Sequence, residues 1–150
     1  MDVTNRKRQG VNAIIPGLLY QRGHFLTWPH ERKMTMLEEL GISVVINLWH
    51  RVDSDLSQDI PGTFYINAPM SPSAMPRDAR SLLDFAGKLL AAGHVTLVHC
   101  EAGKGRSAWF ATRLMAERLG ISKAEAWQIV QQAVPGNSVH GPLLRDLTEE

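Results

Sequence analysis

Short apolar runs alternate along the chain with longer segments in which apolar residues recur every three or four positions. The β-branched run Val44-Val45-Ile46 is typical of a buried strand. Residues 95–99 form a continuously apolar run, the pattern of a strand covered on both faces. The pattern predicts five strands, at residues 14–15, 18–20, 43–48, 63–68 and 95–99.

The same pattern predicts four helices, at residues 29–40, 78–92, 106–119 and 122–134, and a short closing helix within residues 138–150. Ser122 and Glu125 form a capping box at the start of the fourth helix. The apolar spacing in the second helix is i, i+3, i+4, i+7, which is one helical face. The residues expected on this buried face are Leu82, Phe85, Ala86 and Leu89.

The alternation of strands and helices predicts an α/β fold, a three-layer sandwich with a central, largely parallel sheet of about five strands flanked by helices. In such sheets, ligands bind beyond the carboxyl ends of the strands. Cys100 follows one of those ends. A chain of 150 residues suits a single domain over residues 1–150, and residues 1–10, with the basic cluster Arg6-Lys7-Arg8, are expected to form a flexible tail.

Composition narrows the function class. Hydrophobic residues make up 44% and charged residues 21%, and the net charge of +1 gives no basic footprint for nucleic acid, which makes a nucleic-acid partner unlikely. No apolar run approaches the roughly 20 residues that a membrane span needs. The single cysteine excludes an intramolecular disulfide and fits a reducing compartment, so we expect a cytoplasmic protein. The six histidines show no ligand spacing, and we expect no metal and no cofactor.

The segment from Cys100 to Ser107 combines four features that phosphate chemistry requires. A thiol follows a central strand, Gly103 and Gly105 allow the loop to curl into an anion-binding nest, a helix begins where the loop ends, and Arg106 offers a planar fork for two phosphate oxygens. The same positive field favours the thiolate form of a cysteine. The pattern therefore predicts that Cys100 attacks phosphorus and forms a phosphocysteine, which water then hydrolyses.

At these residues the sequence resembles a known family. His99-Cys100-(x5)-Arg106-Ser107 is similar to the signature of the protein tyrosine phosphatase superfamily, and the Gly103-Lys104-Gly105 core resembles its dual-specificity branch. The resemblance extends over residues 13–145. It implies that Cys100 is the nucleophile, that Arg106 clamps phosphate and that Ser107 assists the leaving thiolate. It also implies that His99 supports the loop and that the loop binds substrate through Glu101, Ala102, Gly103, Lys104, Gly105 and Arg106.

One departure from the family pattern concerns the general acid. The family usually supplies an aspartate from the loop that corresponds here to residues 69–76, and this segment has no aspartate. Asp78, at the start of the following helix, and Asp53, in the loop after the strand at 43–48, are the candidates that remain. A charge at a helix N-terminus and a solvated loop charge are the simpler interpretations of these two residues.

Three functions stay open on these grounds. The first is a phosphatase for phosphotyrosine or for several phosphoamino acids, with a phosphorylated protein or a small anionic phosphate ester as its partner. The second is an inositol phosphate, inositol pyrophosphate or phosphoinositide phosphatase, to which Lys104 would contribute charge, although a solvated lysine on the loop rim explains it equally well. The third is a non-catalytic phosphate-binding module, against which the intact Cys100 and Arg106 argue.

Overall fold

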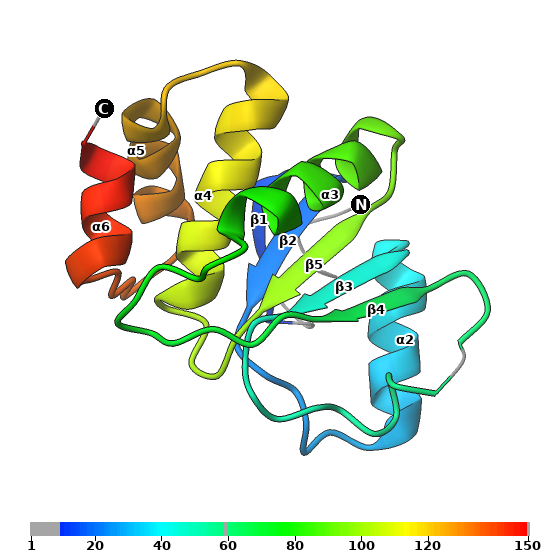
Figure 1. Cartoon of the computed structure of the whole chain (residues 1–150). Helices are drawn as coiled ribbons and strands as arrows, with labels where there is room; N and C mark the ends of the chain where they lie inside the picture. The colour runs from blue at the N-terminus through cyan, green and yellow to red at the C-terminus, as the bar shows by residue number, and fades with distance from the viewer. Residues whose placement is uncertain (1–9, 59, 150) are drawn as a thin grey trace.

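Five strands form one sheet in the order β1-β2-β5-β3-β4 in the computed structural model, which describes residues 10–58 and 60–149 (Figure 1). The strands are β1 (Asn12–Ile15), β2 (Leu19–Arg22), β3 (Val44–Asn47), β4 (Phe64–Asn67) and β5 (Thr96–His99). Only the β1–β2 pair is antiparallel, and the other three pairs are parallel. This confirms the largely parallel five-stranded sheet. Apart from Gly10, the tail expected at residues 1–10 lies outside the described residues.

Helices cover both faces of this sheet. They are α2 (His30–Leu40), α3 (Ala79–Ala91), α4 (Arg106–Leu119), α5 (Lys123–Ala133) and α6 (Gly141–Thr148). Helix α2 lies on one face, and the other four lie on the opposite face (Figure 1). The Ser122 hydroxyl accepts a hydrogen bond from the Glu125 amide at 3.1 Å, which is the expected N-terminal cap of α5. No helix among the described residues is long and apolar enough to cross a membrane.

The sheet separates two apolar cores. Alternate residues of β5 point to opposite faces, so that Leu97 packs on the α2 side and Val98 on the α4 side. Helix α4 supplies the largest part of the second core, with Trp109 and Phe110 fully buried. This helix therefore sits rigidly on the sheet, and its first turn has a fixed position relative to the end of β5.

The buried face of α3 differs from the expected one. The helix buries Ala79, Leu83, Ala86 and Leu90, whereas the side chain of Phe85 is 52% exposed. Two leucine doublets, at 82–83 and 89–90, give this helix two overlapping apolar stripes that share Ala86. Packing against the sheet and α4 selects the stripe with small residues, and Leu82 and Leu89 remain half-buried at its edge. The prediction for Phe85 was wrong because periodicity alone does not distinguish the two stripes.

Candidate active site

Cys100 follows β5, the middle strand of the five-stranded sheet. His99, the last residue of β5, pairs with Arg22 of β2 on one side and with Asn47 of β3 on the other. Three carboxyl strand ends therefore meet around Cys100, whose side chain is almost fully buried. The loop from Cys100 to Gly105 then turns directly into α4, which begins at Arg106.

Glycines allow this loop to lie against the end of β2. Gly103 has a φ of +73°, in the left-handed region, and a Cβ atom there would collide with the backbone nitrogen of Gly23. Gly23 faces the loop in turn, since a Cβ atom on it would lie 2.9 Å from the Glu101 carbonyl oxygen. Gly105 has a φ of −120°, which other residues also adopt. Glycine is needed here for space, because a Cβ atom would lie 3.2 Å from the Ser138 carbonyl oxygen.

The carbonyl groups of the loop are bound by the surrounding fold. The carbonyl of Glu101 accepts from the His24 amide at 3.0 Å, and that of Lys104 accepts from the Ser138 amide at 2.8 Å. The carbonyl of Gly103 accepts from the Gln21 side chain at 2.6 Å. In a trans peptide the N–H and C=O groups point in opposite directions. The next amide after each bound carbonyl is therefore directed away from that partner, and these are the amides of residues 102, 104 and 105.

A hollow of about 150 Å³ opens at this loop. It is bounded by Cys100 and Arg106, by Pro72 from the segment after β4, and by residues from the α5–α6 connection. The complete lining is Pro72, Cys100, Ala102, Lys104, Gly105, Arg106, Ser138, Val139, His140 and Leu143. Ala102, Lys104 and Gly105, whose amides point away from the partners of the bound carbonyls, all line this hollow.

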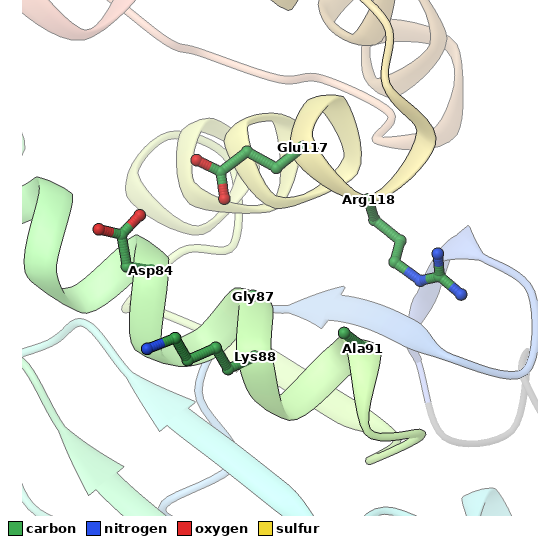
Figure 2. Close-up of a pocket in the computed structure, with 6 residues that line it drawn as sticks. All are labelled: Asp84, Gly87, Lys88, Ala91, Glu117 and Arg118. Atoms are coloured by element: carbon green, nitrogen blue, oxygen red, sulfur yellow. The ribbon is translucent and has the colours of Figure 1, made fainter.

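A larger hollow, of about 410 Å³, lies between α3 and α4 (Figure 2). Its charged lining comprises Asp84, Lys88, Glu117 and Arg118, and both signs of charge alternate along it. It contains no nucleophile and no backbone nest. Size therefore does not single out a candidate site, whereas the lining of the smaller hollow combines a thiol, a guanidinium and the glycine-containing loop.

Arg106 is 11% exposed and reaches across the loop. Its Nη1 donates to the carbonyl oxygen of Met70 at 3.3 Å, and its Nη2 lies 3.8 Å from a carboxylate oxygen of Glu101. The guanidinium is thereby held at the edge of the hollow, where one of its two contacts is a long ion pair to a side chain that is 58% exposed.

Ser107 contacts the sulfur of Cys100, whereas His99 contacts the carbonyl group of Cys100. The Ser107 hydroxyl oxygen lies 3.1 Å from Cys100 Sγ and receives a hydrogen bond from Gln21 at 2.7 Å. The Nδ1 of His99 lies 3.4 Å from the Cys100 carbonyl oxygen, and the ring packs 5.1 Å from that of Phe25. Burial lowers the pKa of His99 to about 4, so the ring is neutral at neutral pH and supports the loop as an uncharged group.

Lys104 is exposed on the rim of the hollow, which agrees with the interpretation as a solvated lysine on the loop rim. Its Nζ donates to the carbonyl oxygen of Pro135, at the end of α5, at 2.6 Å. The side chain borders the hollow, and its Nζ, Cε and Cδ atoms lie 3.4 to 3.9 Å from the position that a Cβ on Gly136 would occupy. The bond to Pro135 ties the loop to the α5–α6 connection, while the ammonium group keeps its charge and two further donors.

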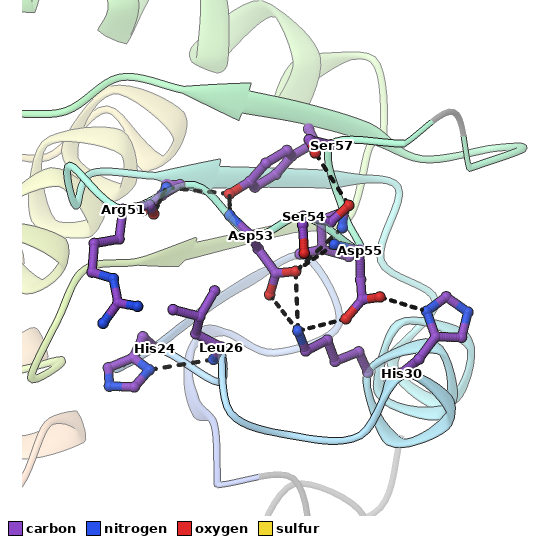
Figure 3. A network of polar contacts seen from close by, with 12 residues as sticks. His24, Leu26, His30, Arg51, Asp53, Ser54, Asp55 and Ser57 are labelled. Carbon is purple, nitrogen blue, oxygen red and sulfur yellow. Dashed lines mark hydrogen bonds and ion pairs between the residues drawn. The ribbon is translucent and has the colours of Figure 1, made fainter.

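The two candidate acids lie outside the lining of the hollow. Asp53 is 3% exposed, and its carboxylate lies 2.9 Å from Nζ of Lys33, which also binds Asp55 at 2.8 Å (Figure 3). Burial alone would lower the pKa of Lys33, but the hydrogen bonds and charges of the two aspartates raise it overall. Asp78 is exposed at the N-terminus of α3 and caps no backbone amide of that helix.

The structure thus brings together Cys100, Arg106, Ser107 and the loop, but not Asp53 or Asp78. It also adds two residues that sequence reasoning missed. Gln21 carries little signal, because it stands between the apolar run Leu18-Leu19-Tyr20 and the charged Arg22. His140 carries none, because nothing near residue 140 indicates that the α5–α6 connection returns to the loop.

Comparisons with known proteins agree with this geometry. A family model described as the dual specificity phosphatase catalytic domain matches residues 24–149. The structure of human DUSP28 is similar with a TM-score of 0.73 at 19% identity, over 93% of this chain and 90% of that one. The human tyrosine phosphatase-like serine/threonine/tyrosine-interacting protein gives a TM-score of 0.75 at 21% identity, over 93% of both chains.

A third solved structure, PTPMT1 in complex with PI(5)P, has a TM-score of 0.69 at 17% identity and covers 89% of each chain. At these identities the similarity establishes the fold. No curated protein sequence matches the chain.

Proposed function

Because the chain belongs to the dual-specificity phosphatase catalytic-domain family, we propose that it hydrolyses phosphomonoesters through a phosphocysteine formed on Cys100. The observation that carries the proposal is the common hollow at the end of β5. A space of about 150 Å³ is lined by Cys100, by Arg106 and by residues 102, 104 and 105, whose amides point away from the partners of the bound carbonyls. Backbone amides, a helix start and a guanidinium together form an anion site beside a nucleophile.

In the first step, the Cys100 thiolate attacks the phosphorus of a phosphate ester. The sulfur–phosphorus bond forms as the bond to the ester oxygen breaks. The leaving oxygen takes the bonding electron pair and then a proton from solvent water, because no carboxylate lines the hollow. Arg106 would release its long contact to Glu101 and bind two equatorial oxygens, where charge is spread in the transition state.

In the second step, water attacks the phosphocysteine. The sulfur–phosphorus bond breaks, sulfur leaves with its electron pair as the thiolate, and dihydrogen phosphate carries both protons of the water. The balance requires no metal or other cofactor. Ser107, 3.1 Å from the sulfur, is placed to stabilise the anion that leaves.

The residues that line the hollow indicate which class of phosphate ester the site would hydrolyse. None of the residues that line it carries a carboxylate, and the two aspartates suggested by the sequence lie elsewhere. A general acid contributes roughly 10²–10⁴-fold to a reaction with a basic leaving group and much less with a weakly basic one. We therefore favour phosphotyrosine and other aryl phosphates as substrates.

A phosphoanhydride, such as an inositol pyrophosphate, satisfies the same requirement and is the second candidate. The structural neighbour PTPMT1 was solved in complex with PI(5)P, so the carbon ester of an inositol phosphate is a further candidate. Lys104 would contribute positive charge at the hollow, although its Nζ also donates to the Pro135 carbonyl oxygen. Phosphopeptides and inositol phosphates compared at equal concentration would separate these substrate classes.

Hydrolysis of para-nitrophenyl phosphate tests the proposal directly. The wild-type protein should release nitrophenol with multiple turnovers, and Cys100→Ser should release none while retaining its fold by circular dichroism. Phosphate binding without turnover in the wild type would instead identify a non-catalytic phosphate-binding module.

A further inference from the structure

A buried glutamine contacts the phosphate loop from the neighbouring strand. Gln21, in β2, is fully buried and contacts Ser107, whose hydroxyl lies beside the sulfur. Its Nε2 donates to the Ser107 hydroxyl oxygen at 2.7 Å and to the Gly103 carbonyl oxygen at 2.6 Å. Its Oε1 accepts from the side-chain amide of Asn12, in β1, at 2.9 Å.

These contacts fix which way the glutamine amide faces. A flipped amide would bring Oε1 against the carbonyl oxygen of Gly103, which can only accept a hydrogen bond. It would also bring Nε2 against the donor of Asn12. Both hydrogens of Nε2 are therefore committed, one to Gly103 and one to Ser107, and Gln21 acts toward the serine as a donor.

The donor role of Gln21 determines the role of the serine. A hydroxyl has one hydrogen and two lone pairs, and Gln21 occupies a lone pair of Ser107. A serine in a helix often turns its hydrogen to the carbonyl four residues earlier, as Thr112 does to Ala108 at 2.7 Å in the same helix. For Ser107 that carbonyl belongs to Gly103, which receives Gln21 instead, and the contacts of the described residues include no bond from Ser107 to it.

The sulfur of Cys100, at 3.1 Å, is then the partner left for the serine hydrogen. We propose that Gln21 is a positioning residue that holds the Ser107 hydroxyl as a hydrogen-bond donor to the Cys100 thiolate, an inference that rests on the proposed phosphatase function. The hydrogen bond stabilises sulfur when it is an anion, which is before it attacks phosphorus and after it leaves. The step most affected is the breakdown of phosphocysteine, in which the electron pair of the breaking bond returns to sulfur.

Gln21→Met tests this positioning role, because methionine is unbranched and of similar length and removes both donors. With para-nitrophenyl phosphate under rapid mixing, we expect phosphocysteine breakdown to slow roughly tenfold, as for a lost hydrogen bond to a charged group. A burst of nitrophenol should then precede a slower steady state. Ser107→Ala should show the same behaviour.

The double variant separates positioning from a structural effect. If Gln21 acts through the serine hydroxyl, Gln21→Met in the Ser107→Ala background should slow breakdown no further. Equal tenfold losses in both backgrounds would overturn the proposal. Thr112→Val, which removes a hydroxyl from the same helix away from the sulfur, is the matched control and should leave breakdown unchanged.

Alkylation by iodoacetate gives a readout that needs no turnover. The chain has one cysteine, so mass spectrometry reports Cys100 alone. We expect the pH of half-maximal alkylation to move upward in Gln21→Met and in Ser107→Ala. If the wild type hydrolysed no phosphate ester while this shift appeared, the proposed function would fail and the positioning role of Gln21 would stand. If the pH of half-maximal alkylation were unchanged in a folded Gln21→Met, the positioning role would be refuted. Should Gln21→Met not fold, Asn12→Ala, which frees Oε1 of the glutamine, should produce a smaller shift in the same direction, and no shift would count against the proposal.

Discussion

Arg106 is hydrogen-bonded to a residue that lies 36 positions earlier: its Nη1 lies 3.3 Å from the carbonyl oxygen of Met70. Met70 is held in turn, since its amide donates to the Leu48 carbonyl oxygen at 3.0 Å. The segment after β4 is thus tied both to β3 and to the arginine at the start of α4. The guanidinium plane is oriented by the fold before any phosphate arrives.

We expect Arg106→Lys to lower kcat/KM for para-nitrophenyl phosphate by about 100-fold or more. A lysine keeps the charge but loses the planar fork that binds two oxygens, and each hydrogen bond to a charged partner contributes about 1.5–3 kcal/mol. Steady-state kinetics measure the loss. Arg118→Lys, at the exposed end of the same helix, is the control. A fall in kcat/KM of less than threefold in Arg106→Lys would contradict the role of Arg106 in binding phosphate.

The rate should depend steeply on the leaving group. Because no carboxylate lines the hollow, kcat/KM should fall roughly 100-fold from para-nitrophenyl phosphate to phenyl phosphate. Asp78→Asn should leave both this ratio and the pH–rate profile unchanged, since Asp78 does not border the hollow. Loss of the alkaline limb of the profile in Asp78→Asn would instead identify that residue as the proton donor.

Breaking the buried ion pair of Lys33 and Asp53 should destabilise the fold. The Lys33 and Asp53 side chains are 3% and 5% exposed, and Asp53→Asn leaves the buried ammonium of Lys33 with Asp55, at 2.8 Å, as its remaining carboxylate. Asp53→Asn should lower the free energy of unfolding by about 1–3 kcal/mol, because a buried charged group loses one of its two partners. Urea denaturation measures this change, with the exposed carboxylate in Asp84→Asn as control, and kcat should change little at temperatures where the variant is folded.

Stability should fall on mild acidification because of His99. Burial lowers the pKa of this residue from its ordinary value of 6.5 to about 4, so the unfolded chain binds a proton there in a range where the native state does not. The stability contributed by the neutral ring is present above pH 6.5 and is lost as the pH falls toward 4, by about 3 kcal/mol. Urea titrations across this range should show the free energy of unfolding falling with pH in the wild type and in His50→Asn. Absence of this fall in His99→Gln would assign it to His99.

The sequence reveals most readily what is local in the chain. The strands and helices followed from apolar spacing, and the candidate site could be recognised because Cys100, the loop and Arg106 are consecutive. The partners of the loop were not predictable in this way, because Gln21, Met70 and Ser138 reach it from distant segments. The hydrogen bond from Lys104 to the Pro135 carbonyl oxygen was not predictable for the same reason.

The aspartates show a second limit on what can be predicted from the sequence. An aspartate in a loop near a strand end looks the same in the sequence whether it faces a ligand or an internal lysine. Asp53 meets Lys33 because α2 covers the opposite face of the sheet, and no spacing between residues 33 and 53 indicates that contact.

The close approach of Gly103 to Gly23 has a consequence for how the protein folds. These residues are 80 positions apart in the sequence, and the contacts of Gln21 with Gly103 and Ser107 span 82 and 86 positions. Loop-closure entropy makes such contacts slow to form. The loop therefore acquires its shape late, when β2 has joined β5. A peptide of residues 95–120 would contain both Cys100 and Arg106 but would lack the strand that shapes the turn between them.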